Sequence, residues 1–107
     1  MHYAALVLFE SSSDQAGYAP QFEESLILVT AQSVDDARAK AAYFAHQRQS
    51  QYQTASGAVI RWILTKIVDI SPVVDEPLGD GSEIYSRHFR TLTDYERFDR
   101  SSRNDTA

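Results

Sequence analysis

Five residues of this 107-residue sequence have side chains suited to binding a ligand or a partner. They come from three stretches in which apolar residues alternate as in β-strands: Glu24, Arg61, Trp62, Tyr85 and Arg87. Glu24 and Arg61 could form a partly buried ion pair, and an arginine could instead stack on an aromatic ring. Cross-strand pairs that only fix the register of a sheet are the more common role of such residues. Because Trp and Arg are enriched at binding hot spots, we expect any interaction surface on the sheet to include these five residues.

The other polar residues lack the spacing that catalysis requires. Adjacent residues of a strand point to opposite faces, so neighbouring carboxylates cannot share a substrate. Two such pairs occur, Glu23 with Glu24 and Asp75 with Glu76. The serines at 11–13 have no G-x-S-x-G elbow, and the glycines at 79 and 81 precede no helix that could bind phosphate. We therefore assign no catalytic and no cofactor-binding residue, and the sequence favours a protein that is not an enzyme.

Metal binding is not expected either. His2, His46 and His88 are scattered along the chain, and no cysteine is present, so the spacing of a zinc site does not occur. The segment 80–83, Asp-Gly-Ser-Glu, lacks the alternating acidic ligands of a calcium loop and is expected to be a turn. The lack of cysteine also excludes disulfides and thiolate nucleophiles.

The charge balance argues against nucleic acid and membranes as partners. The net charge is -5, whereas neutralising phosphates requires a basic face. Arg87, His88 and Arg90 form the nearest basic cluster, which we expect to be solvated on an edge strand. No apolar run approaches the roughly 20 residues that span a membrane. Residues 1–10 lack the basic leader and cleavage site of a signal peptide, so we expect a cytoplasmic protein.

The stretch from Phe22 to Ala45 is expected to be a strand followed by a helix. In residues 22–30, both alternating sets of positions become apolar toward the C-terminal end, as in a central strand. Ser33 stands at the N-cap position of the helix, and Asp36 stands three residues later at the capping-box position. Apolar residues then recur at three- and four-residue steps, and the alanines between 37 and 45 allow the helix to lie close to a sheet.

Three further strands are expected, at Tyr3–Phe9, Ala58–Ile70 and Glu83–Phe89. The first is almost entirely apolar and is predicted to be central in the sheet. In the second, the even positions from 60 to 70 are apolar except for Lys66, which predicts one fully buried face. The third has polar residues on both sides, as edge strands often do.

The intervening segments are expected to be irregular. Glu10–Pro20 is rich in serine and contains Gly17, so it is predicted to be a loop, either a mobile connection or a binding loop. The helix is expected to end between Gln47 and Tyr52 within a polar stretch. Residues 71–82 contain two prolines and two glycines, which indicates an excursion between strands.

The order strand, strand, helix, strand, strand predicts an α+β domain with a mainly antiparallel four-stranded sheet and one long helix packed on one face. Residues 1–90 are expected to form this single domain, and residues 91–107 a polar tail. In the tail, the three-residue spacing of Leu92, Tyr95 and Phe98 allows one or two helical turns packed on the body. Ser101–Ala107 is expected to be frayed.

One helix covers only one face of a sheet, yet the strands at 3–9, 26–30 and 59–70 carry apolar residues on both faces. A second apolar face is too large a hydrophobic surface for a soluble monomer. The sequence therefore predicts a homodimer, or a permanent protein partner, that covers the second face.

Four segments together resemble a bacterial family of small proteins that is known only as domain of unknown function 4288. In order, they are YAALVLFE, FEESLILVTAQSVDDARAKA, GAVIRW and DGSEIYSRHF. The resemblance covers most of residues 3–90, with Val more usual than Ile84 and a Trp more usual near Tyr3. It implies a bacterial source and supports the predicted fold, and it implies no established activity.

Two classes of function follow from these features. The first is a non-enzymatic, homodimeric protein-interaction module, such as an accessory or immunity-type protein, because apolar sheet surface is in excess and catalytic spacing is missing. The second is a small-molecule binding protein or small enzyme. Its pocket would lie between the sheet and the Glu10–Pro20 loop and would be lined by Tyr18, Trp62 and Tyr85.

Overall fold

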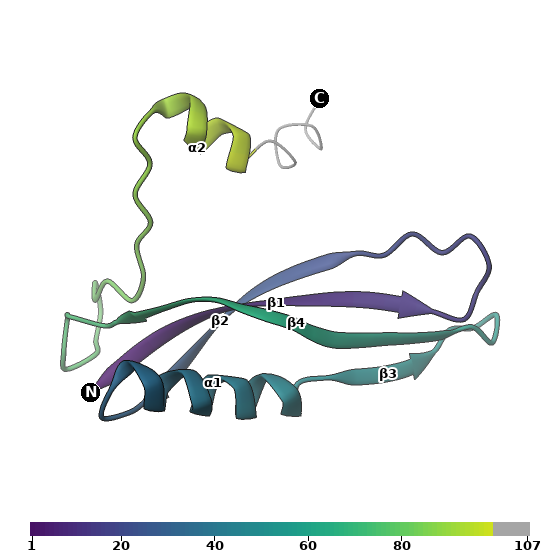
Figure 1. Ribbon diagram of the computed structural model, residues 1–107, viewed down its shortest axis with the longest axis horizontal. Helices are drawn as coiled ribbons and strands as arrows, with labels where there is room; N and C mark the ends of the chain where they lie inside the picture. Colours follow the sequence, from purple (N-terminus) through teal and green to yellow (C-terminus); the bar gives the residue numbers. More distant parts are fainter. Residues whose placement is uncertain (100–107) are drawn as a thin grey trace.

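A computed structural model describes residues 1–99 as a four-stranded antiparallel sheet with one helix packed on it and a second helix beyond it (Figure 1). The elements are β1 (His2–Ser13), β2 (Phe22–Thr30), α1 (Val34–Gln47), β3 (Ser50–Gln53), β4 (Val59–Pro72) and α2 (Leu92–Phe98). The strand order is β2-β1-β4-β3, and every neighbouring pair is antiparallel. The predicted α+β class and four-stranded antiparallel sheet are confirmed, whereas the identity of one strand and the number of helices differ from the prediction.

Local sequence explains where α1 begins. Ser33 has an extended backbone, and its side chain accepts a hydrogen bond from the backbone N–H of Asp36 at 3.1 Å. The Asp36 carboxylate reaches back to the backbone N–H of Gln32 at 3.2 Å, one residue before the N-cap. This arrangement resembles a capping box, and the shorter Asp side chain serves a different donor from the one that a Glu serves there. The predicted N-terminus of the helix is therefore confirmed.

The main core lies between α1 and one face of the sheet, which we call the helix face. Ala37, Ala41 and Ala45 point into this face and are fully buried. Because their side chains are small, the helix approaches the strands closely. The residues that complete this core come from three strands and the turn before α1: Tyr3, Ala5, Val7, Phe9, Ile27, Val29 and Ala31, with Trp62, Leu64, Ile67 and Ile70 packed against them. The alternate residues of β1 and β2 point to the opposite side of the sheet, which we call the far face.

β4 departs from strict alternation. Relative to β1 it contains one extra residue at Thr65 and another at Val68. Each bulge reverses the alternation of side chains along the strand. As a result Ile67 packs into the core and Lys66 pairs with Leu8 on the far face. The prediction that even positions share one face along the whole of β4 is therefore wrong between residues 65 and 68.

The fourth strand is not the one that the sequence predicted. β3 (Ser50–Gln53) is a short, fully exposed edge strand that forms a hairpin with β4. Gly57 adopts a φ of 91° in the connecting turn, a conformation that only glycine adopts without strain. Glu83–Phe89, predicted as the edge strand, pairs with no strand, because the irregular segment after β4 leads it away from the sheet.

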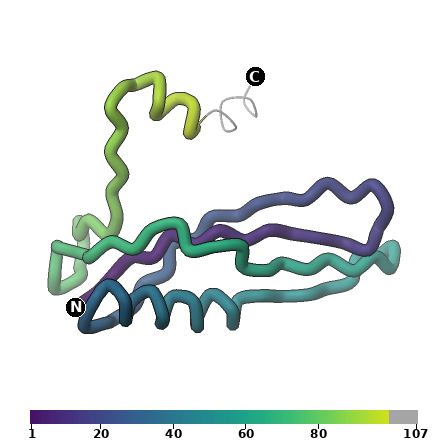
Figure 2. The backbone as a smooth tube through the Cα atoms, viewed as in Figure 1, coloured from purple at the N-terminus to yellow at the C-terminus, as the bar shows by residue number. Residues whose placement is uncertain are grey.

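Residues 86–99, which we call the arm, extend away from the sheet on the side opposite α1 (Figures 1 and 2). The arm ends in α2, whose N-cap Thr91 accepts a hydrogen bond from the backbone N–H of Asp94 at 3.1 Å. The helical turn predicted around Leu92 is present. It does not pack on the body, because α2 contacts neither the strands nor α1 in the described part of the chain. The predicted fraying of Ser101–Ala107 concerns residues outside that part.

Candidate functional site

Of the five residues singled out in the sequence, Glu24, Tyr85 and Arg87 lie close enough for the charges of Glu24 and Arg87 to act on Tyr85, whereas Arg61 and Trp62 lie apart from them. Glu24 pairs with Leu8 and Arg61 pairs with Ser12, both on the far face. The two positions on β1 lie four residues apart, about 13 Å along the strand. Within residues 1–99, Glu24 and Arg61 form no ion pair, and the Arg61 Nε donates a hydrogen bond to the Gln51 Oε1 at 3.0 Å. The predicted ion pair is therefore absent.

Tyr85 and Arg87 lie at the base of the arm, near Glu24. The Tyr85 hydroxyl donates a hydrogen bond to the Asp69 Oδ2 at 2.8 Å, which holds the start of the arm against the far face. Burial, together with the Asp69 carboxylate, raises the pKa of Tyr85 above its ordinary value of 10.0. The Arg87 guanidinium stacks on the Phe98 ring at 4.9 Å within the arm. Trp62 lies on the helix face, away from these four.

The far face carries exposed apolar side chains on β2 and β4, which we call the patch, and a row formed by Glu24, Leu8 and Lys66 divides it. Its large side chains are Phe22 (62% exposed), Leu26 (46%), Leu28 (48%) and Ile63 (47%). On β1 between them, Ala4 and Leu6 are buried. Tyr85 lies over this part of the face, because its partner Asp69 pairs with Leu6 in the sheet. The rest of the patch is open, as the sequence predicted for the face opposite the helix.

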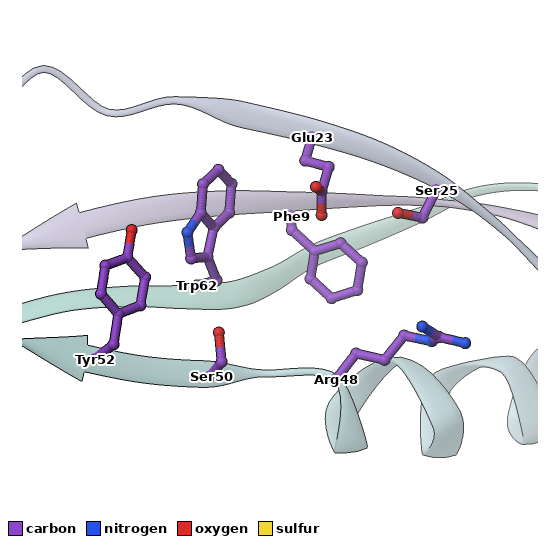
Figure 3. Close-up of a pocket in the computed structure, with 7 residues that line it drawn as sticks. All are labelled: Phe9, Glu23, Ser25, Arg48, Ser50, Tyr52 and Trp62. Atoms are coloured by element: carbon purple, nitrogen blue, oxygen red, sulfur yellow. The ribbon is translucent and has the colours of Figure 1, made fainter.

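A cleft lies on the helix face where α1 ends and the strands continue (Figure 3). Its volume is about 370 Å³, and all four strands contribute to its lining. Phe9 and Trp62 provide aromatic surface, and the polar lining comes from Glu23, Ser25, Arg48, Ser50 and Tyr52. The cleft exists because the 14 residues of α1 cover only part of the length of β1 and β4.

The cleft carries opposite charges on opposite sides. Glu23 projects into it from β2, whereas Arg48 projects from the C-cap of α1, where a cation is favoured by the helix dipole (Figure 3). Among residues 1–99 neither side chain has an ion-pair partner. Together with the Trp62 ring, this arrangement suits a small ligand that has a flat apolar part and both charges.

The aromatic pocket predicted at the Glu10–Pro20 loop is not formed. Residues 10–13 belong to β1, and the Tyr18 hydroxyl donates a hydrogen bond to the Ser11 Oγ at 2.6 Å instead of lining a cavity. The Ser11 Oγ also accepts a hydrogen bond from the backbone N–H of Gln21 at 2.8 Å. Because Tyr85 lies on the far face, Trp62 is the one member of the predicted trio that lines the cleft. Tyr18 therefore has a structural role in closing the loop.

The described residues contain no cluster of His, Asp and Glu that could hold a metal ion. The His2 Nδ1 and the Glu76 Oε1 form a short hydrogen bond at the start of β1, and this contact lowers the pKa of the Glu76 carboxyl. Nor does any helix within residues 1–99 have the length and hydrophobicity to cross a membrane.

Comparison with known proteins identifies the family. The family model described as "Domain of unknown function (DUF4288)" matches residues 2–86, so this chain belongs to that family. The match includes the whole sheet and α1 and ends at Ser86, before α2. No curated protein and no solved structure matches the chain.

Most of the cleft residues could not be predicted from the sequence. Strand alternation identifies buried residues, but it does not by itself show which part of the sheet the helix leaves uncovered. The relevant signal is the parity of the polar residues on β2. Glu23 and Ser25 occupy the same alternating set as Ile27 and Val29, which are buried beneath α1. A change from apolar to polar within one set indicates where the cover ends. Arg48 and Ser50 gave no such signal, because they follow the helix.

Proposed function

We propose that this protein is a non-enzymatic protein-interaction module that forms a homodimer through the far face of its sheet. The observation that supports the proposal is the exposed apolar patch of Phe22, Leu26, Leu28 and Ile63 on the face that α1 does not cover. Exposed apolar side chains that gather on one face of a sheet mark a candidate interaction site. A second copy is the partner that is always available at the concentration of the protein itself.

The proposal is tested by charging the patch. Leu26→Glu and Leu28→Glu place a carboxylate in the centre of the expected interface, where burial without a partner is unfavourable. We expect light scattering to give twice the 12.0 kDa chain mass for the unmodified protein and the single chain mass for the variants. Val34→Glu is the matched control, because Val34 is a similarly exposed apolar residue at the start of α1.

Circular dichroism is measured alongside, so that loss of dimer is separated from loss of fold. A dimer that persists in both leucine variants would place the interface elsewhere. A folded monomer for the unmodified protein, whatever its concentration, would contradict self-association. In that event, the protein could still be an interaction module if it captures a different protein stably and Leu26→Glu abolishes the capture. That protein, and not a second copy of the chain, would then be the partner.

A second candidate function is binding of a small ligand in the cleft. The specific observation is that Glu23 and Arg48 line the same cleft without pairing, next to the Trp62 ring. A molecule with a flat ring, an amino group and a carboxylate would contact all three side chains. Free aromatic amino acids are the simplest molecules of this class.

The single tryptophan of the chain makes this candidate easy to test. Titration with phenylalanine, which adds little fluorescence of its own, is expected to shift the Trp62 emission in a saturable manner. Arg48→Gln and Glu23→Gln are expected to weaken the response, whereas Arg38→Gln, an exposed change elsewhere on α1, should leave it unchanged. An emission spectrum that stays constant up to millimolar ligand would exclude this class of ligand.

A further inference from the structure

We infer that the two copies of the dimer exchange their arms, so that residues 86–99 of each copy pack on the far face of the other. This inference rests on the proposed function, since it names the segment that covers the exposed patch. It arises from two sets of exposed apolar side chains on one chain, the patch on the sheet and the side chains of the arm.

α2 buries little surface within its own chain. α2 has seven residues and buries none of them, whereas isolated helices of fewer than about 12 residues are marginal in water. Leu92 is 71% exposed, and Tyr95 and Phe98 are about half exposed. These three side chains recur at three-residue steps and therefore lie on one side of the helix. A segment with this composition requires a surface to pack on.

Contacts within the arm nevertheless fix its shape. The Phe89 ring packs edge-on against Tyr95 with 5.4 Å between ring centres, and it lies 5.8 Å from Phe98. The Arg87 guanidinium covers the Phe98 ring. The arm thus presents a preformed aromatic hook, and preorganisation of this kind lowers the entropy lost on binding.

The sizes of the two surfaces match. The arm exposes parts of four large side chains, Phe89, Leu92, Tyr95 and Phe98, and the far face exposes Phe22, Leu26, Leu28 and Ile63. Side chains of this kind present roughly 150–250 Å² when fully exposed, so each half-exposed set offers on the order of 400 Å². Two reciprocal contacts would bury on the order of 1,600 Å², the usual size of a specific interface.

Charge and symmetry also favour a second copy as the occupant. Glu24 lies among leucines on the far face without an ion-pair partner in residues 1–99, and Arg90 in the arm is likewise unpaired. An arm that carries Arg90 thus meets a face that offers a carboxylate, despite the net charge of -5 on each chain. Each chain has one arm and one far face. In a two-fold dimer both arms and both faces are occupied, so the assembly is closed and does not polymerise.

The starting point of the arm is compatible with exchange. The Tyr85–Asp69 hydrogen bond holds the base of the arm on the far face, and from there the backbone leads away from the sheet (Figure 1). α2 therefore stands on the same side of the molecule as the patch without touching any strand of its own chain. A second copy that faces the patch meets both surfaces at once.

Crosslinking between single-cysteine variants tests the exchange, because the full chain has no cysteine of its own. Leu92→Cys in the arm is mixed with an affinity-tagged Leu26→Cys on the far face, and a short bis-maleimide is added. We expect mixed crosslinked pairs at least roughly tenfold above those from Leu92→Cys with Arg38→Cys, an exposed position on α1, because contact raises the effective concentration from micromolar to millimolar.

The double variant Leu26→Cys/Leu92→Cys separates exchange from back-folding within one chain. Exchange gives crosslinked species of dimer mass, whereas a crosslinked monomer would overturn the inference. A third outcome is that mixed pairs stay at the control level, although the unmodified chain is a dimer and Leu26→Glu makes it monomeric. That outcome would exclude the arm exchange and support the far-face dimer. A protein that is monomeric throughout would exclude both.

Discussion

At the scale of single residues, Ser11 is the buried polar group with the most demanding surroundings. It is fully buried, and its Oγ accepts hydrogen bonds from the Tyr18 hydroxyl and from the backbone N–H of Gln21. A serine at this position looks like part of a flexible polar run in the sequence. In the structure it closes the loop between β1 and β2, and this depends on residues up to ten positions away.

Removing this hydroxyl is expected to be costly. Ser11→Ala leaves the Gln21 N–H and the Tyr18 hydroxyl without their acceptor, and we expect the free energy of unfolding to fall by about 1–3 kcal/mol. Chemical denaturation monitored by circular dichroism measures the change. The neighbouring Ser12→Ala, at a half-buried position, is the control and should change stability by less than about 0.5 kcal/mol. Equal effects of the two substitutions would contradict the role assigned to Ser11.

Tyr85 gives the base of the arm a pH dependence. Its pKa is raised in the folded protein, so its stabilising contribution is fully present below pH 10.0 and is lost as the pH rises through the folded value. Tyr85→Phe removes the hydrogen bond to Asp69 and should lower the free energy of unfolding by at most about 1 kcal/mol, because the bond is open to solvent. Denaturation at neutral and alkaline pH should show this difference shrinking above pH 10.0; a constant difference would argue against the bond.

At the scale of secondary-structure elements, the close approach of α1 to the sheet depends on its buried alanines. Ala41 is fully buried, whereas Ala39 is exposed on the same helix. Ala41→Leu is expected to lower the free energy of unfolding by about 1–3 kcal/mol through overpacking. Ala39→Leu should leave stability nearly unchanged, since both residues favour helices. Thermal unfolding of the two variants compares them directly, and a tolerated leucine at 41 would mean that the helix lies farther from the strands.

The elements that could be predicted are those whose signal is local. The α1 N-cap requires only Ser33 and its near neighbours, and the central strands β1 and β2 are evident from their apolar runs. β3 could not be predicted, because its four residues are all exposed and gain their structure from pairing with β4. The bulge at Thr65 depends on β1 in the same way. Glu83–Phe89 has the alternation of a strand, yet no strand edge lies beside it.

The candidate sites were predicted in outline only. The sequence correctly indicated that α1 leaves apolar side chains exposed on the opposite sheet face, but β4 contributes only Ile63 to them, since Arg61, Lys66 and Asp69 also lie on that face. It did not indicate the cleft beside Trp62, because the length of sheet that α1 leaves uncovered depends on where the helix ends. The predicted proximity of Glu24 and Arg61 failed because register places them on different parts of the far face.

At the scale of the whole molecule, this member of the DUF4288 family combines a half-covered sheet with a projecting arm. The radius of gyration of 16.9 Å exceeds the roughly 13 Å of a compact domain of this length, which reflects the projection. Both features leave apolar surface in water, and both are accommodated if the functional unit contains two chains. A homodimer is thus the assembly that accounts for both features.

The homodimer is tested by sedimentation equilibrium of the unmodified chain, over a concentration series from nanomolar to high micromolar. We expect a single reversible transition from the 12.0 kDa chain to a species of twice that mass, without larger assemblies, because reciprocal contacts close the pair. A mass that stays at 12.0 kDa across the whole series, for a protein shown to be folded, would contradict it.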